Sequence, residues 1–190
     1  MKTKILILTL LLSFTFYSCK ESKKETVKET TKTTEEMHKG QSAVVDKESE
    51  PNALQVAVSL DDFKTLVVAV KAADLENALV NAGPLTVFAP VNGAFDKLPK
   101  GTVETLLKPE NKDQLAFILK NHVAPANYTI ATLDKNVRKK RKLYMASGEY
   151  LEVTKEGEDL FVGGTKILKS VKVSNGWIHV IGDVLVPSDK

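Results

Sequence analysis

The folded part of the chain opens with apolar residues at helical spacing. The first set falls at i, i+3, i+4 and i+7 and lines one face of a helix: Ala53, Val56, Ala57 and Leu60. The same spacing predicts further helical segments at residues 63–70, 74–79, 92–98 and 111–122, with a turn after Thr102. Polar residues at the expected helix starts are predicted to act as N-caps: Ser59, Asp74, Asn92 and Asn111.

Beyond residue 123 the pattern changes to short runs of β-prone residues. Apolar residues such as Leu143 and Met145 alternate there with more polar neighbours, as in half-buried strands. Strands are predicted at residues 128–130, 142–145, 149–154, 160–162, 167–173 and 177–181, after one early strand at 85–89. Helices first and antiparallel strands afterwards predict the α+β fold class.

The last predicted strand is apolar on both of its faces. Its side chains alternate, with Ile178 and Val180 on one face and Trp177, His179 and Ile181 on the other. Such a strand belongs inside a fold rather than at a solvated edge. A histidine in that position fits either a structural or a catalytic role.

The first residues have the composition of a secretory signal. Lys2 and Lys4 precede an apolar run, and the small residue Ser18 follows it. The run is shorter than the roughly 20 apolar residues that a membrane-spanning helix requires. We therefore assign residues 1–18 to a signal peptide.

Lysine, glutamate and threonine dominate the next segment, which contains no aromatic residue. Because this composition buries too little apolar surface to offset the entropy of ordering, we predict a flexible tether over residues 19–50. A single domain is expected over residues 51–188. Loss of Lys2 and Lys4 with the signal would lower the formal net charge from +3 to +1. A near-neutral chain gives no electrostatic reason to expect nucleic acid as a partner.

The residue pattern gives little support for catalytic or metal chemistry. Cys19 is the only cysteine, which excludes an internal disulfide and a cysteine-based zinc site. The domain holds two histidines, His122 and His179, fewer than the three or four ligands that a metal site needs. We expect no enzyme activity, no metal and no cofactor, with both histidines hydrogen-bonded in the core. An alternative stays open: an envelope enzyme or small-ligand-binding protein that uses His122 or His179.

Five consecutive cations are the sharpest charge feature of the chain: Arg138, Lys139, Lys140, Arg141 and Lys142. They fit a site for an anionic ligand, such as a sulfated or uronic-acid polysaccharide. A solvated loop that leads into the next strand is the simpler interpretation. No aromatic residue interleaves with the cations, which disfavours single-stranded nucleic acid as the ligand.

Two stretches, residues 86–95 and residues 175–181, resemble the two signature boxes of fasciclin-like domains. Between them, residues 119–123 stand where that family carries a tyrosine–histidine pair. The positions that match the family's structural signature are Thr86, Phe88, Pro90, Asn92, Phe95, His122, Gly176, Ile178, His179 and Pro187.

The resemblance implies a fasciclin-like fold, in which a helical N-terminal half is followed by an antiparallel β-sandwich or wedge. It also implies a non-enzymatic surface protein, associated with adhesion and with contacts to matrix polymers, polysaccharides or other surface proteins. Departures from the family pattern are Val91 for a capping threonine or serine, Asn121 for the tyrosine of the pair, the bulky Trp177, and Gly182-Asp183 in place of an aspartate. Because Asn121 replaces the tyrosine, the integrin binding linked to that region in animal relatives is not expected here.

Ser18 followed by Cys19 at the end of the signal resembles a bacterial lipoprotein signal, in which the cysteine becomes the lipidated first residue. This implies a bacterial protein anchored by lipid in the cell envelope, at the outer membrane, on its periplasmic or its surface-exposed face. An ordinary signal peptide cut nearby is the alternative. The partners expected are the membrane, through the anchor, and a polysaccharide or surface-protein ligand.

Overall fold

The computed structural model describes residues 50–80 and 83–187, all within one compact unit. The first half is helical around one strand, with α1 (Ala53–Ser59), η2 (Asp61–Phe63), α2 (Lys64–Ala72), α3 (Glu76–Val80), β1 (Leu85–Pro90), α4 (Asn92–Phe95), α5 (Thr102–Leu106), η3 (Pro109–Asn111) and α6 (Lys112–Lys120). The second half contains β2 (Val123–Ala124), α7 (Ile130–Arg138), β3 (Leu143–Tyr144), β4 (Tyr150–Leu151), β5 (Val153–Glu156), β6 (Asp159–Val162), β7 (Thr165–Val173) and β8 (Gly176–Ile181).

Six of these strands form one sheet in the order β2-β1-β8-β7-β6-β5, and β3 pairs with β4 in a separate two-stranded ribbon. The last strand, β8, lies between β1, which runs parallel to it, and β7, which runs antiparallel. The α+β class is confirmed, and the sheet is mixed rather than antiparallel throughout. The parallel pair is possible because a long connection, containing most of the fold, separates β1 from β8.

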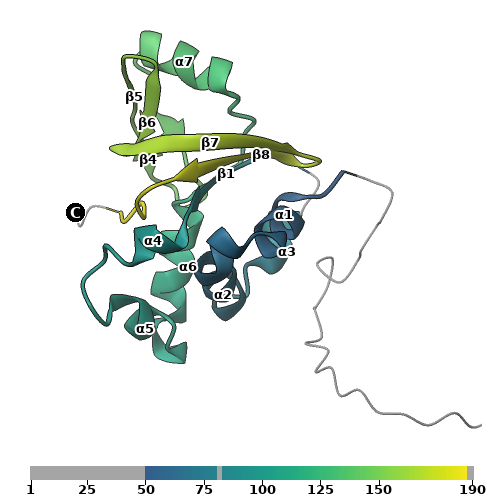
Figure 1. The fold of residues 1–190 in the computed structure, drawn as a ribbon, viewed down its shortest axis with the longest axis vertical. Helices are drawn as coiled ribbons and strands as arrows, with labels where there is room; N and C mark the ends of the chain where they lie inside the picture. Colours follow the sequence, from purple (N-terminus) through teal and green to yellow (C-terminus); the bar gives the residue numbers. More distant parts are fainter. Residues whose placement is uncertain (1–49, 81–82, 188–190) are drawn as a thin grey trace, which may run out of the picture. The chain divides into compact units, whose positions relative to one another are not determined.

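Two hydrophobic clusters lie on opposite faces of β1 and β8. On one face Val87, Ala89 and Ile178 pack among the helices, and on the other Phe88 and Ile181 pack with side chains from α7 and the later strands. In Figure 1, α1 to α6 accordingly lie on one side of the β1–β8–β7 strands, while α7, β5 and β6 lie on the other. The alternation predicted along β8 is confirmed, and the strand is interior.

Gly176 allows β8 to approach β1 closely. Its φ is 149°, in the region that favours glycine, and it stands opposite Leu85 in the parallel register. A Cβ atom at Gly176 would lie 1.7 Å from the carbonyl oxygen of Leu85. Only glycine fits at this end of the pair.

The strand predicted at residues 128–130 is wrong, because α7 begins there. The Thr129 hydroxyl accepts the backbone N–H of Thr132 at 3.1 Å, which is an N-cap bond. Within α7, Leu133 is fully buried and Asn136 is buried beside it. Ile130, Leu133 and Val137 recur at i, i+3 and i+7, so the helical signal is present in the sequence, and the strand prediction came from the β-prone residues 128–130 at its start.

Two of the predicted helix caps, at Ser59 and Asn111, are also wrong in detail. Asn52 caps α1 by a reciprocal bond with Gln55, each at 2.9 Å, whereas the Ser59 hydroxyl donates to the carbonyl of Val56. Asn111 precedes α6, but its amide donates to a carbonyl of α5 and caps nothing. Asp74 stands two residues before α3 at a positive φ of 53°, and its role as a cap of this helix stays a prediction.

Candidate functional site

His179 lies in the middle of β8 and is fully buried. Its Nε2–H donates to the carbonyl oxygen of Tyr128 at 2.7 Å, so Nδ1 is the acceptor for the Ser170 hydroxyl, also at 2.7 Å. The ring lies against Phe88 and Trp177, with centroid separations of 5.4 and 6.3 Å. Burial lowers the pKa of His179 below its ordinary value, so the ring is neutral at pH 7 and joins β8 to β7 and to the segment before α7.

His122 follows α6 and is also buried. Its Nδ1–H donates to the carbonyl of Ile118 at 2.8 Å, and its Nε2 accepts the backbone N–H of Leu185 at 2.9 Å. The neighbouring Asn121 donates its amide to the carbonyl of Leu185 at 3.0 Å. The side chains of His122 and Asn121 therefore bind the N–H and the carbonyl oxygen of Leu185, as the backbone of a neighbouring strand would. Burial lowers the pKa of His122 from 6.5 to about 4.

Both ring nitrogens of each histidine are thus occupied by hydrogen bonds within the fold. The Ser170–His179 contact is the nearest approach to a serine–histidine pair, but Ser170 lies inside the regular strand β7 rather than on the strained turn of a nucleophile. Within residues 50–80 and 83–187, no group of three or more His, Cys, Asp or Glu residues is placed to hold a metal ion. The geometry is that of two structural histidines.

The basic run starts on the last residue of α7 and continues through the turn that ends this helix. The N–H of Lys140 donates to the carbonyl of Val137 at 3.1 Å, and the N–H of Arg141 donates to that of Asn136 at 2.9 Å. These bonds, with Lys140 at φ 51°, form a Schellman cap in which lysine occupies the usual glycine position. Cations here also complement the negative end of the helix dipole. The end of α7 therefore accounts for part of the run.

Ion pairs divide the five cations into two groups. Arg138 contacts Asp134 within α7, and Lys142 contacts Glu152 at 3.1 Å. The other three have no ion-pair partner among the residues that the structure describes: Lys139, Lys140 and Arg141. Of the sequence-predicted anion-binding residues, these three have no protein carboxylate within the described ranges that would compete with an anionic ligand.

A groove of about 380 Å³ runs between the end of α7 and β5, lined by Val137, Lys140, Arg141, Lys142, Glu152, Val153, Thr154 and Lys155. The β3–β4 ribbon flanks it. Tyr144 and Tyr150 are paired across this ribbon with ring centroids 5.4 Å apart, and they are 47% and 62% exposed. Because side chains alternate along a strand, Lys142 and Glu152 project from the same face as the two rings. We call the groove and the tyrosine pair the α7 basic surface.

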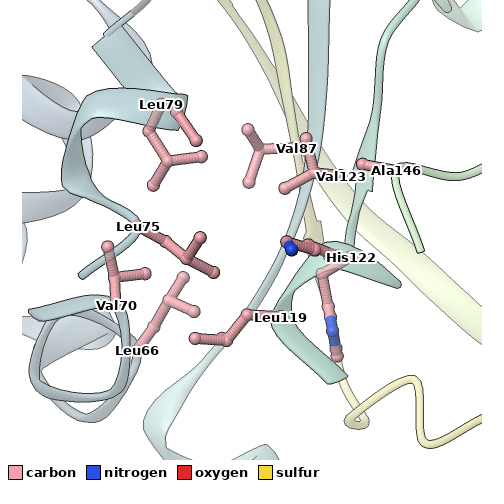
Figure 2. Close-up of a pocket in the computed structure, with 11 residues that line it drawn as sticks. Leu66, Val70, Leu75, Leu79, Val87, Leu119, His122, Val123 and Ala146 are labelled. Atoms are coloured by element: carbon pink, nitrogen blue, oxygen red, sulfur yellow. The ribbon is translucent and has the colours of Figure 1, made fainter. Parts of the chain in front are cut away.

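A second hollow, of about 150 Å³, lies on the helix side of β1. In Figure 2, leucine and valine side chains of α2 and α3 face Val87, Leu119 and Val123 across it. We call it the helix-side pocket; its lining is Leu66, Val70, Leu75, Ala78, Leu79, Val87, Leu119, Lys120, His122, Val123 and Ala146.

Comparison with known protein families gives a match to the Fasciclin domain over residues 61–187. That range contains both predicted signature boxes and most of the described fold. The chain belongs to the fasciclin family.

Similar proteins come from bacteria and animals. The fasciclin chain is 45% identical over 150 residues to Protein sll1483 of Synechocystis sp., covering 77% of this chain and 81% of that one. It is 32% identical over 139 residues to transforming growth factor-beta-induced protein ig-h3 of Sus scrofa, covering 72% of this chain and 20% of the longer relative. The FAS1 domain pair of the insect cell adhesion molecule fasciclin I is similar in structure, with a TM-score of 0.66 at 19% identity over 72% of this chain and 51% of that one. At that identity the likeness shows the fold alone.

Six of the ten fasciclin signature residues lie on β1 or β8, and the other four lie on α4 (Asn92 and Phe95), after α6 (His122) and after β8 (Pro187). The buried Thr86 donates its hydroxyl to the carbonyl of Ala126 at 2.7 Å and accepts the N–H of Tyr128 at 2.9 Å. The apolar members are buried or half-buried in the fold: Phe88, Pro90, Phe95, Ile178 and Pro187. The signature therefore secures the β1–β8 pair and the segments that cross its ends.

Asn92 does not cap α4, as the sequence had predicted. Val91 is the N-cap residue of α4 and makes no side-chain hydrogen bond. The Asn92 side chain instead accepts the N–H of Thr65 at 3.0 Å and donates to the carbonyl of Asp61 at 2.8 Å. It thus caps α2, which is distant in sequence but adjacent in the fold.

The shifted aspartate of the fasciclin pattern still makes hydrogen bonds. Asp183 accepts from the Lys97 ammonium at 2.7 Å and from the Thr165 hydroxyl at 2.9 Å, and Lys97 also donates to the carbonyl of Gly182 at 2.8 Å. The Lys97 bond, followed by the Thr165 bond, holds the pKa of Asp183 below its ordinary value. The Gly182-Asp183 shift therefore leaves the Asp183 carboxylate fully hydrogen-bonded, with Lys97 and Thr165 as its partners.

Sequence analysis did not single out Tyr144, Tyr150, Lys155 or the helix-side pocket. The alternation that assigned Leu143 to the core also places Tyr144 outward, so that signal was present. The groove and the pocket need contacts between distant segments, which no local pattern shows. Cys19 lies outside the described residues. No helix in the described ranges is long and apolar enough to cross a membrane.

Proposed function

We propose that this fasciclin chain is a non-enzymatic adhesion module of the bacterial cell envelope, held by a lipid on Cys19, that binds an acidic polysaccharide through the α7 basic surface. One observation carries the ligand assignment. Lys139, Lys140 and Arg141 have no ion-pair partner among the described residues, and they lie on the segment that leads into the exposed tyrosine pair. The fold similarity to a cell adhesion molecule is consistent with this role.

An acidic polysaccharide offers two kinds of group that match this surface. Its carboxylates or sulfates suit the guanidinium and ammonium groups beside the groove. The apolar faces of its sugar rings suit Tyr144 and Tyr150, which present rigid aromatic area with a polar tip. Because the cations are exposed, their attraction weakens as salt shortens the Debye length to about 8 Å at 0.15 M.

Retention on a column of uronic-acid or sulfated polysaccharide tests the cations. The variant Lys139→Gln/Lys140→Asn/Arg141→Gln keeps a residue that tolerates positive φ at position 140. We expect it to elute at clearly lower salt than the native chain. The matched control Lys100→Gln/Lys108→Gln/Lys172→Gln removes the same charge from exposed lysines elsewhere and should elute later than the groove variant. If both triple variants eluted at the same salt concentration, net charge alone would explain the retention and the α7 basic surface would not be a specific site.

The tyrosine pair distinguishes a polysaccharide from a polyphosphate. Tyr144→Ser/Tyr150→Ser removes the aromatic area and leaves all cations in place. We expect weaker retention on the glycan column and unchanged retention on immobilised polyphosphate. If the double variant were retained on the glycan column as strongly as the native chain, the surface would not be specific for polysaccharide.

The anchor is tested by Cys19→Ala in cells. We expect the native chain in the membrane fraction and the variant in the soluble fraction, because several acyl chains hold a protein stably where none remain. Unchanged membrane association of the variant would remove the lipid anchor from the proposal. Protease treatment of intact cells then separates a surface-exposed domain, which is cleaved, from a periplasmic one.

A further inference from the structure

The helix-side pocket has a buried apolar floor and an open rim. The floor side chains come from α2, α3, β1 and α6 and the residues after it: Leu66, Val70, Leu79, Val87, Leu119 and His122. His122 adds no free polar atom, because both of its ring nitrogens are hydrogen-bonded to backbone groups. The rim side chains are exposed: Ala78, Lys120 and Ala146. A ligand would therefore enter from solvent and meet carbon atoms.

Lys120 carries the one charge among the described residues that line this pocket. It is the last residue of α6, is exposed, and has no ion-pair partner in the described ranges. Within residues 50–80 and 83–187, no acidic side chain lines the pocket. An ammonium group at the mouth of an apolar hollow complements a molecule with a hydrocarbon chain and an anionic head.

We propose that the helix-side pocket binds an aliphatic carboxylate, with the hydrocarbon chain on the Leu/Val floor and the carboxylate at the Lys120 ammonium. The volume of about 150 Å³ sets the length of the chain. Cavities of this size in protein cores accept a ring of six carbon atoms, so the pocket takes about six methylene or methyl groups. The site is separate from the α7 basic surface and does not depend on the proposed function.

A chain-length series tests the hydrocarbon part of this site. Butanoate, hexanoate, octanoate, decanoate and dodecanoate are titrated by calorimetry at pH 7, below their micellar concentrations, into the full chain carrying Cys19→Ala so that no acyl group of its own competes. We expect affinity to rise up to about fourfold per methylene, and to level off beyond about eight carbons, where the chain outgrows the pocket. Absence of binding at millimolar octanoate, or an affinity independent of chain length, would overturn the proposal.

Rim variants locate the ligand. Ala78→Phe places a ring in the mouth and should lower octanoate affinity at least tenfold, whereas the control Ala131→Phe, at an exposed alanine on α7, should leave it unchanged. Ala146→Phe blocks the opposite rim and serves the same purpose if Ala78→Phe disturbs α3. Unchanged octanoate affinity in folded variants of both rims would place the ligand elsewhere and overturn the assignment.

The charge is tested by comparing octanoate with 1-octanol. We expect native protein to favour octanoate by about two- to fivefold, the range for an exposed ion pair, and Lys120→Gln to lose that preference while binding 1-octanol as before. The control Lys100→Gln should keep the preference. A preference that survives in Lys120→Gln would contradict the role of this lysine. The triple variant of the α7 basic surface should bind octanoate normally, so failure of either proposal is recognised independently of the other.

Discussion

Gly176 shows how one residue determines a strand pair. A Cβ atom there would lie 1.7 Å from the carbonyl oxygen of Leu85, and the backbone has a positive φ of 149°. We expect Gly176→Ala to lower the free energy of unfolding by about 3 kcal/mol or more, because it adds overlap to backbone strain. Urea unfolding measures the loss. The control Gly157→Ala has positive φ but open space around the new methyl group and should lose only about 1 kcal/mol. Similar losses in both variants would contradict the close approach of β8 to β1.

At the same scale, His122 makes stability depend on pH. Its pKa falls from 6.5 to about 4 on folding, so between these values the unfolded chain binds a proton that the folded chain does not. The contribution of neutral His122 to the free energy of unfolding is therefore complete above pH 6.5. It is lost as the pH falls toward 4, and the total loss is about 3 kcal/mol. Urea unfolding across this range measures the slope.

The variant His122→Gln separates this residue from other titrating groups. We expect lower stability at pH 7, because the bond from the Leu185 N–H is perturbed, and a smaller loss of stability between pH 6.5 and 4. Part of the slope should remain, since burial lowers the pKa of His179 in the same direction. The lowered pKa values of Asp134 and Asp183 act below about pH 3.8 and fall outside this window. An unchanged slope in the variant would assign the effect to another group.

At the scale of the element, α7 ends in an energetically unfavourable way. Lys140 occupies the left-handed position of the Schellman cap, which costs a side-chain-bearing residue about 1–2 kcal/mol relative to glycine. We expect Lys140→Gly to raise the free energy of unfolding by about 0.5–1 kcal/mol after the entropy of glycine in the unfolded chain is counted. Lys139→Gly, one residue earlier at φ −95°, removes the same charge and should destabilise instead. Equal effects of the two variants in urea unfolding would rule out the φ argument.

At the scale of the molecule, the two hydrophobic clusters share β1 and β8. Because these strands contribute side chains to both, loss of either cluster removes the support of the other. We expect Leu133→Ala, on the α7 side, and Leu66→Ala, on the helix side, each to cost about 2–5 kcal/mol. In both variants, far-UV circular dichroism and Trp177 fluorescence should report one coincident transition. Separate transitions for the two probes would show that the clusters fold independently.

Much of this fold follows from the sequence alone. The α+β class, the early helices, the strand at β1 and the two faces of β8 each depend on periodicity over a few neighbouring residues, which the chain carries wherever it folds. The burial of His122 and His179 follows from the apolar residues beside them. Each of these features depends on residues that are neighbours in the chain, so each can be predicted from the sequence.

Only the tertiary structure decided which distant groups meet. The parallel pairing of β1 with β8, the capping of α2 by Asn92 and the clamp of His122 on Leu185 all join segments that no local pattern connects. Likewise Lys142 of the basic run meets Glu152 only through the β3–β4 pairing, and the helix-side pocket exists only where elements from both halves of the domain converge. Pairing, neutralisation and cavity shape are properties of contacts, and contacts between distant residues form only when the chain is folded.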